Sequence, residues 1–357
     1  MQSSKRKRVL IVRIGAMGDV LHAMPAVAAL GLAHPEWEIG WVVEPRWLPL
    51  LRSADEPRGP RMPLVDHVYL AATKAWKKQP LSGRTLADIR SLARSLRDAR
   101  FDLCVDLQGS IRSAVIGRMA GAMRLAGPAK PRETPARWLY REKIATHATH
   151  VVEQGGELLS VAVGENLLPA KVVFPEDEAA EAACDHLLDQ ALGEQKRFVL
   201  MAPSAGWGAK RWPAERYGEV AKHLAEAGFG VLVNASVADN NLALRVVEAS
   251  GNRASVVPTS LAELIALTRR AALVIAGDTG PLHLAAALER PVVAIFGPTD
   301  PARNGPYATL ARVLRSPSSC TDHSRHSAPE QGMLEITSDA VTEAAFELLK
   351  AEQDKVV

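Results

Sequence analysis

The sequence predicts an α/β protein of two doubly wound, Rossmann-like units, each built on a parallel sheet. Three observations lead to this prediction. Short β-branched runs alternate with longer amphipathic segments, the pattern of successive β-α-β units. The 357 residues are about twice the length of one typical domain. The segment from Leu168-Pro169 to Pro175 follows an expected helix and precedes an acidic stretch, and therefore separates the halves.

The N-terminal half, residues 1–174, is expected to hold four strands joined by helices. Its β-branched runs are Val9–Ile14, Ile39–Glu44, His67–Leu70 and Leu103–Leu107. Its helical segments are Val20–Leu30, Leu86–Ala99 and Val151–Val163. In the second of these, apolar residues recur at the i, i+3, i+4 spacing of an amphipathic helix.

The C-terminal half, residues 175–337, repeats the alternation. Its strands are expected at Phe198–Met201, Val231–Asn234, Ser255–Val257, Leu273–Ala276 and Val292–Phe296, with helices at Ala214–Ala227 and Leu261–Ala271. Segment Ser316–Gly332 is polar and aperiodic, which indicates a loop. The last segment, 338–357, is expected to form a helix over Ser338–Ala351 with Ser338 as N-cap. It can pack on either unit, and the N-terminal domain is the expected partner.

Composition and charge exclude several classes of protein. With 47% hydrophobic and 23% charged residues, the chain is not intrinsically disordered. A balance of 43 basic against 40 acidic residues is too even for a dedicated nucleic-acid binder. The three cysteines, Cys104, Cys184 and Cys320, provide neither a disulfide framework nor zinc-ligand spacing. Arg13 interrupts the first apolar run, so a signal peptide is not expected, and no stretch of 18 uncharged apolar residues could span a membrane. These features predict a soluble, cytoplasmic protein.

In sheets of this kind ligands bind at the carboxyl ends of the strands, which directs attention to the loops that follow them. The first such loop is Gly15-Ala16-Met17-Gly18-Asp19. Its glycines permit a tight turn, but it lacks the G-x-G-x-x-G pattern of dinucleotide sites. Asp19 either caps the following helix, which would stabilise it by about 1 kcal/mol, or acts as a general base beside a glycine backbone that a ligand can approach closely. Spacing alone leaves both interpretations open.

Two further loops follow strands of the second half. The first spans Ala202–Pro213, where small residues precede Lys210; it is either a phosphate cradle or an exposed loop whose tryptophans pack on the core. The second spans Gly277–Ala287 and opens a helix that Asp278 and Thr279 can cap. A diphosphate can bind at such a helix N-terminus. A lone helical histidine such as His283 is more often structural than chemical.

Five motifs, taken together and in this order, indicate more than the spacing of single residues does. GAMGDVLHAMPA, FDLCVDLQGSIRSAVIG, AKRWP, GDTGPLHLAAAL and VVAIFGPTDPARNGPYA together resemble the ADP-heptose lipopolysaccharide heptosyltransferases, an inverting glycosyltransferase family (family 9) with the GT-B fold. The resemblance runs from Val9 to about Ala308, and GDTGPLH with FGPTDP is its most specific part. VLIVRIGAMGDVLH, WVVE and RWLYREK look closer to heptosyltransferase I than to heptosyltransferase II.

The resemblance implies donor binding by the C-terminal domain and acceptor binding by the N-terminal domain. Asp19 matches the family's catalytic base, and Lys210 matches the residue that neutralises the diphosphate of ADP-heptose. No metal and no cofactor are implied, because inverting transfer needs one base and charge stabilisation on the leaving group. Further donor contacts are expected at Gly18, Ser204, Asp278, Thr279, Gly280, Pro281, Leu282 and His283.

The implied acceptor is Kdo-lipid A at the membrane surface. Lys74, Lys77 and Lys78 match a basic segment that faces it, and Arg13 and Arg141 add charge; the alternative is a solvated charged surface. Residues 5–8 are either a contact with anionic headgroups or a basic tail. The chain is predicted to act as a monomer, with a peripheral contact to the cytoplasmic face of the inner membrane.

The sequence departs from the family pattern at two places, and rival functions remain. Cys320 stands alone where related proteins often carry a cysteine-rich tail. The acidic ribose contact expected after Asn234 is absent, and Asp239 is the substitute that the sequence offers. The rivals are a transferase for another sugar nucleotide and glycan, a non-catalytic nucleotide-sugar binding protein, and a nicotinamide-dependent oxidoreductase. The last lacks its glycine fingerprint in both halves.

Overall fold

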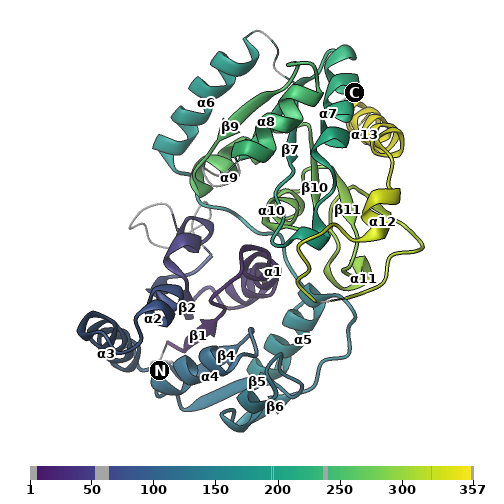
Figure 1. The fold of residues 1–357 in the computed structure, drawn as a ribbon. Helices are drawn as coiled ribbons and strands as arrows, with labels where there is room; N and C mark the ends of the chain where they lie inside the picture. Colours follow the sequence, from purple (N-terminus) through teal and green to yellow (C-terminus); the bar gives the residue numbers. More distant parts are fainter. Residues whose placement is uncertain are drawn as a thin grey trace. The chain divides into compact units, whose positions relative to one another are not determined.

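The computed structural model describes residues 6–52, 64–193, 195, 197–235, 240–322 and 324–354. The chain divides into two compact units, Met1–Pro175 and Glu176–Val357, one residue beyond the expected boundary (Figure 1). No helix in the described part of the chain has both the length and the apolar character needed to cross a bilayer.

Unit 1 contains a parallel six-stranded sheet in the order β3-β2-β1-β4-β5-β6. Its strands are β1 Arg8–Val12, β2 Glu38–Val43, β3 His67–Leu70, β4 Leu103–Asp106, β5 Arg124–Pro128 and β6 Glu142–Ile144. The four expected strands are confirmed. Strands β5 and β6, which read RLAGP and EKI, were not predicted, because glycine, proline and charged residues interrupt the apolar pattern of these short strands near the sheet edge.

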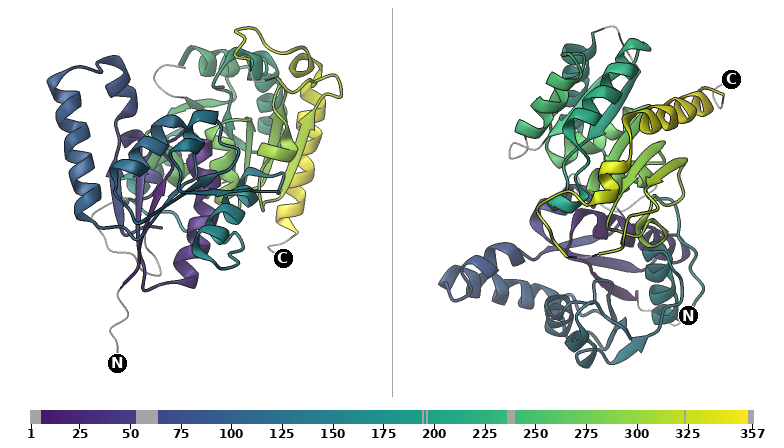
Figure 2. Two further views of the ribbon diagram at one scale, coloured as in Figure 1. Left: turned by 90° about the horizontal axis from the view of Figure 1, so that it is seen from below. Right: turned by 45° about the vertical axis from the view of Figure 1, so that its right-hand side comes forward.

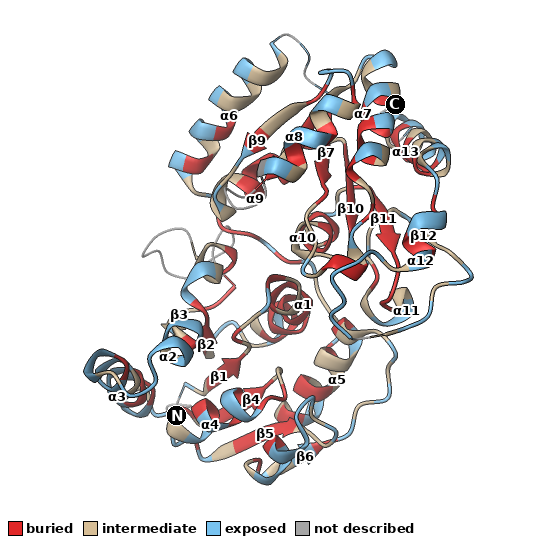
Figure 3. Cartoon of the chain, in the orientation of Figure 1, coloured by how far each residue is buried: buried red, intermediate tan, exposed pale blue. Residues whose placement is uncertain are grey.

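The helices of unit 1 lie on both sides of this sheet. They are α1 Met17–Ala33, η1 Pro45–Leu50, α2 Thr73–Lys78, α3 Gly83–Asp98, α4 Ile111–Met119, η2 Thr134–Trp138 and α5 Val151–Val163. Helix α1 is buried over most of its circumference and packs against α5. Helix α3 instead buries a narrow face around Leu92 and Leu96 and exposes the rest (Figure 3).

Unit 2 contains a second parallel six-stranded sheet, in the order β12-β11-β10-β7-β8-β9. Its strands are β7 Phe198–Ala202, β8 Gly230–Ala235, β9 Ser255–Pro258, β10 Leu273–Gly277, β11 Val292–Phe296 and β12 Ala311–Arg315. Counted within each unit, both sheets follow the order 3-2-1-4-5-6, so the predicted Rossmann-like topology is confirmed twice. The order reverses between β1 and β4 and between β7 and β10, where such sheets bind ligands.

The helices of unit 2 include the segment that ends the chain. They are α6 Glu178–Leu192, η3 Gly208–Lys210, α7 Ala214–Glu226, α8 Asn240–Ala249, α9 Leu261–Arg270, α10 Gly280–Ala287, α11 Pro301–Asn304, α12 Gln331–Glu335 and α13 Ser338–Gln353. The expectation that the last helix packs on the N-terminal domain is wrong. Its buried face, with Val341, Ala345 and Leu348, joins the core of unit 2 against α7 and β10–β12 (Figure 2). Its N-cap is Thr337, whose hydroxyl accepts from the Ala340 N–H, and not Ser338.

Candidate active site

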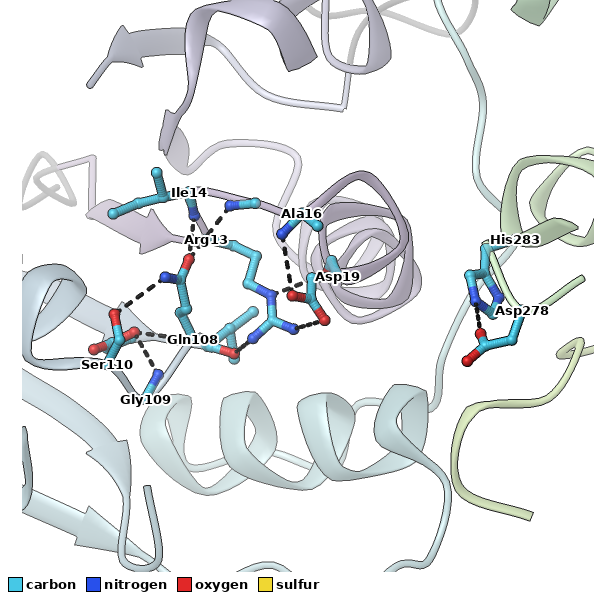
Figure 4. Close-up of polar contacts among 12 residues, drawn as sticks. Arg13, Ile14, Ala16, Asp19, Gln108, Gly109, Ser110, Asp278 and His283 are labelled. Carbon is cyan, nitrogen blue, oxygen red and sulfur yellow. Dashed lines mark hydrogen bonds and ion pairs between the residues drawn. The ribbon is translucent and has the colours of Figure 1, made fainter. Parts of the chain in front are cut away.

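Asp19 is the third residue of α1, in the first helical turn after β1. One carboxylate oxygen, Oδ2, accepts from the Ala16 N–H at 3.1 Å, and the other, Oδ1, pairs with Arg13 at 2.9 Å (Figure 4). Asp19 therefore does help to cap α1, but by reaching back from the first turn and not as the N-cap itself. Its side chain remains 34% exposed, so the capping contact leaves the carboxylate within reach of a ligand.

Arg13 is fixed against Asp19. Besides the ion pair, its Nε donates to the Asp19 carbonyl at 2.9 Å, and Nη1 donates to the carbonyl of Leu107 after β4. Only 14% of its side chain is exposed. The guanidinium thus connects the turns after β1 and β4, which are the two strands at the reversal point of the sheet.

Gln108 makes a second connection between the same two turns. Its Oε1 accepts from the N–H groups of Ile14 at 2.8 Å and Gly15 at 3.3 Å, and its Nε2 donates to Ser110 Oγ (Figure 4). The turn that carries Gln108 is anchored on the buried Asp106, whose carboxylate accepts from the N–H groups of residues 108 and 109. Gln108 was not among the predicted site residues, although the polar DLQG directly after an apolar strand was an available signal.

Asp106 is fully buried at the end of β4. Its carboxylate also accepts from Ser113 Oγ at 2.8 Å and from the Tyr140 hydroxyl at 2.7 Å. Burial raises the pKa of Asp106 above its ordinary value, although the four hydrogen bonds oppose that shift. Because all its partners lie within unit 1, Asp106 serves as the fixed point on which the Gln108 turn is built.

Four cations gather at the carboxyl ends of β2 and β3: Arg46, Lys74, Lys78 and Arg112, here called the cationic cluster. Glu44 organises it, because its carboxylate accepts from the Thr73 hydroxyl at 2.8 Å and the Lys74 N–H at 3.1 Å. Arg112 donates to the same Thr73 hydroxyl at 2.8 Å. Partial burial and the nearby charges of Arg46 and Lys78 lower the pKa of Lys74. The two lysines were predicted from the sequence, and the two arginines were not.

Other expected acceptor residues lie elsewhere in unit 1. Arg141 donates to the carbonyl of Met123, at the amino ends of β5 and β6 and therefore at the opposite end of the strands from the cationic cluster. Lys77 is exposed on α2. Of the basic N-terminal residues, Arg6 and Arg8 pair with Glu38 and Lys7 lies over the Trp37 ring, whereas Lys5 falls outside the described residues.

In unit 2, Lys210, Asp278 and His283 form a buried triad. Lys210 Nζ pairs with Asp278 Oδ2 and donates to the Asp278 carbonyl at 3.3 Å, while His283 Nε2 lies 3.0 Å from Asp278 Oδ1. Burial opposes the ionisation of Asp278, but the hydrogen bond to His283 and the charges of His283 and Lys210 together hold its pKa well below the usual range. The triad joins the turns after β7 and β10, the strands at the reversal point of this sheet.

The start of α10 follows this triad directly. Its N-cap is Thr279, but neither Asp278 nor Thr279 caps it through the side chain: the Thr279 hydroxyl donates instead to the Gly277 carbonyl at 3.2 Å. Of the two residues expected to cap this helix, Thr279 is the N-cap, although not through its hydroxyl, and Asp278 bonds within the triad instead. Gly280, Pro281 and Leu282 form the first turn of α10, whose N-terminus favours an anion.

The polar segment Ser316–Gly332 crosses over the turn that carries Lys210. The Ala209 N–H donates to the His326 carbonyl at 3.1 Å, and the Glu330 N–H donates to the Ala209 carbonyl at 3.2 Å. A Cβ placed on Gly208 would lie 1.6 Å from the Ser327 carbonyl oxygen, so only glycine fits there. The segment is irregular as predicted, up to its last two residues, which begin α12.

The two tryptophans of the loop Ala202–Pro213 have different surroundings, and the phosphate cradle stays a prediction. Trp212 is buried in the core, where its indole N–H donates to the Ile336 carbonyl at 2.9 Å. Trp207 instead lies beside cations, with its ring centroid 4.2 Å from Lys210 Nζ and 5.7 Å from the Arg325 guanidinium. Ser204 lies two residues beyond β7. Asp239, the offered ribose contact, falls outside the described residues.

The likeness to known proteins covers nearly the whole chain. A model of glycosyltransferase family 9 (heptosyltransferase) matches residues 89–334. Lipopolysaccharide heptosyltransferase 1 of Escherichia coli K12 is 27% identical over 94% of this chain and 98% of its own length; the enzyme of that name from Pseudomonas aeruginosa is 29% identical over 88% and 85%. The solved structure of E. coli heptosyltransferase WaaC with ADP covers 96% of this chain and 99% of its own, with a TM-score of 0.76 and 26% identity. This agreement confirms the expected GT-B fold.

Proposed function

The chain belongs to glycosyltransferase family 9, and from that premise we propose that it transfers a heptose from ADP-heptose to the Kdo inner core of lipopolysaccharide. The names of its relatives support the heptose and the lipopolysaccharide, and the solved relative with ADP supports the nucleotide. The observation that carries the proposal is the position of two sets of residues. Asp19 follows β1, and the triad joins the turns after β7 and β10, so each set lies at the reversal point of a Rossmann-like sheet.

In this proposal Asp19 is the general base. It accepts the proton of the acceptor hydroxyl while that oxygen attacks the anomeric carbon of the heptose, and the bond from that carbon to the diphosphate oxygen breaks. The configuration at the anomeric carbon inverts because a single displacement occurs. Arg13 positions the base, because its guanidinium holds both the carboxylate and the carbonyl of Asp19.

Lys210 stabilises the negative charge that develops on the leaving ADP. In the structure Lys210 is paired with Asp278, so binding of a diphosphate requires it to exchange or share that partner. The first turn of α10 offers the N–H groups of Gly280 and Leu282 and a favourable dipole to the same anion; Pro281 has no N–H to donate. Thr279, His283, Ser204 and Gly18 complete the proposed donor contacts. No step requires a metal; this, together with the absence of a cofactor, a monomeric state and a cytoplasmic location, stays a prediction.

The cationic cluster is the proposed site for the carboxylates of the acceptor Kdo sugars. The charge of Arg46 lowers the pKa of Lys74, and Arg112 donates to the hydroxyl of Thr73, the residue before Lys74. A carboxylate placed among these cations would relieve their mutual repulsion. This assigns Lys74 and Lys78 to the sugar part of the acceptor, and adds Arg46 and Arg112 to it.

The proposal is tested by measuring ADP release from ADP-heptose with Kdo-lipid A as acceptor. Turnover that depends on both substrates supports it. Binding of ADP without turnover would mean that the sugar or the glycan is a different one, and the heptosyltransferase assignment would be wrong. Failure to bind ADP at all would remove the donor assignment of Lys210 and α10.

Gln108→Leu is expected to lower kcat about tenfold and to leave the KM for ADP-heptose unchanged. The substitution leaves the N–H groups of Ile14 and Gly15 without their acceptor, a loss of about 1–3 kcal/mol, and loosens the turn that holds Asp19. Steady-state kinetics and urea denaturation check this result. Gln190→Leu on the exposed face of α6 is the matched control. A variant that is less stable but has the wild-type kcat would show that Gln108 has no part in positioning the base.

A further inference from the structure

The segment Thr73–Arg100, which comprises α2, its connection and α3, concentrates positive charge. It contains eight lysines and arginines against two aspartates, a net charge of +6, whereas the whole chain carries only +3. The rest of the protein is therefore net acidic. All eight cations are exposed, and among the described residues none of them forms an ion pair with a carboxylate. Within the part of the chain that the structure describes, this surface is thus not neutralised by carboxylates.

The arrangement of these cations on α3 is unfavourable for the helix by itself. Arg90, Arg94 and Arg97 are spaced four and three residues apart, so their side chains lie on one face of α3. Like charges at this spacing destabilise a helix by a few tenths of a kcal/mol per pair. Figure 3 shows that the outer face of α3 is exposed. An anionic partner bound between these arginines would reduce their mutual repulsion, and this reduction would contribute to the binding free energy.

Apolar side chains lie among the cations where α3 begins. Ser82 is the N-cap, and its hydroxyl accepts from the Thr85 N–H at 3.1 Å. Leu81 and Leu86 therefore occupy the positions before the cap and in the first turn that commonly pack on each other. Yet Leu81 is 88% exposed and Leu86 39%. The ordered cap thus presents leucine to solvent between Lys78 and Arg84.

We propose that the surface formed by Leu81, Leu86, Arg84, Arg90, Arg94 and Arg97, here called the α3 surface, binds the anionic face of a membrane. Leucine among cations fits an interfacial contact, with the apolar side chain in the headgroup boundary and the cations on lipid phosphates. A nucleic acid is the less suitable partner, since it is usually held with aromatic rings among the cations. Here Trp76, the aromatic residue of the segment, has its indole nitrogen buried.

This inference rests on the proposed function in one respect, namely that the acceptor is anchored in a lipid. Helix α2 has six residues and spans about 9 Å, with Lys74 of the cationic cluster at its start and the connection to Leu81 at its end. The acceptor sugar would therefore meet the cluster while its lipid lies against the α3 surface. In this inference, the part of the segment in α2 binds the acceptor sugar and the α3 surface binds the lipid.

The test is vesicle sedimentation of the full chain, with phosphatidylcholine alone and with added phosphatidylglycerol. We expect wild type to bind only the anionic vesicles, and added salt to weaken binding. Arg90→Ala with Arg94→Ala should weaken binding about 30-fold, from about 1 kcal/mol for each cation. Leu81→Ser should also weaken binding. Lys222→Ala with Lys350→Ala removes two exposed cations from unit 2 and is the matched control.

Several outcomes would overturn the inference: equal binding to both vesicle types, no binding by wild type, or equal losses in the α3 variants and the control. Tighter binding of a fluorescent oligonucleotide than of anionic vesicles would also overturn it. The assay needs neither donor nor acceptor. If the protein transfers heptose but does not bind vesicles, only the membrane-binding role of the α3 surface is contradicted. If it binds anionic vesicles but transfers no heptose, only the proposed function is contradicted.

Discussion

Asp19→Asn is expected to lower kcat for heptose transfer by about a hundredfold or more, with the affinity for ADP unchanged. Asparagine keeps the size of the side chain and an oxygen that accepts from the Ala16 N–H, but it cannot take the proton of the acceptor hydroxyl. ADP-release kinetics and calorimetric titration of ADP measure the two quantities separately.

The control for this variant is another helix-starting aspartate. Asp177 is the N-cap of α6 and accepts from the Ala180 N–H at 2.9 Å, so Asp177→Asn perturbs a cap without touching the site. Both variants should cost no more than about 1 kcal/mol in stability. If Asp19→Asn retains the wild-type kcat, Asp19 is only a capping residue and the base lies elsewhere.

Lys210→Ala is expected to lower kcat/KM by two to three orders of magnitude, because it removes a charge aimed at the developing anion. It should also destabilise unit 2 by about 3 kcal/mol, since the side chain of Asp278 is only 8% exposed and keeps only His283 of its two partners in the triad. The double variant Lys210→Ala with Asp278→Asn also removes the buried carboxylate that has lost its lysine partner. We expect it to recover stability but not activity; recovery of both would contradict the role of Lys210.

Acid unfolding gives an independent check on the same pair. Because the pKa of Asp278 is depressed in the folded protein, the pair contributes stability above the ordinary aspartate pKa, and this stability is lost as the pH falls through the depressed value. Without Lys210 the depression is smaller, so Lys210→Ala should lose this stability at a higher pH than wild type. Urea unfolding midpoints of both proteins, measured at several pH values below 5, would show this shift. If the midpoints of wild type and Lys210→Ala fall in parallel as the pH is lowered, the shift is excluded.

The strands were predictable where both faces of the sheet are covered. Central strands such as β1, β7 and β11 read as unbroken apolar runs because helices bury them on both sides. Strands β5, β6 and β12 were missed, because strands near a sheet edge bury fewer side chains and their charged residues interrupt that pattern. Helix α6 was read only as an acidic stretch, since it buries little beyond Ala180 and Cys184.

The site was predictable where its residues follow one another in a motif, and not where distant segments meet. Asp19, Lys210 and Asp278 each lie in a loop with a recognisable pattern after a strand. Gln108 acts on Ile14 from 94 residues away, and nothing in its own segment indicates that partner. Arg112 likewise reaches Thr73 across 39 residues. Such contacts depend on strand order, which local patterns do not specify.

The reversal of strand order has a consequence for folding kinetics. The bond from Gln108 to Ile14 closes a chain loop of 94 residues, and the pair of Lys210 and Asp278 closes one of 68. Loops of this length are entropically expensive and form slowly, after local helices and neighbouring β-α-β units. During refolding, the capacity to bind and react therefore arises with the pairing of β1 with β4 and of β7 with β10, and a chain that has regained most of its helix is still catalytically silent.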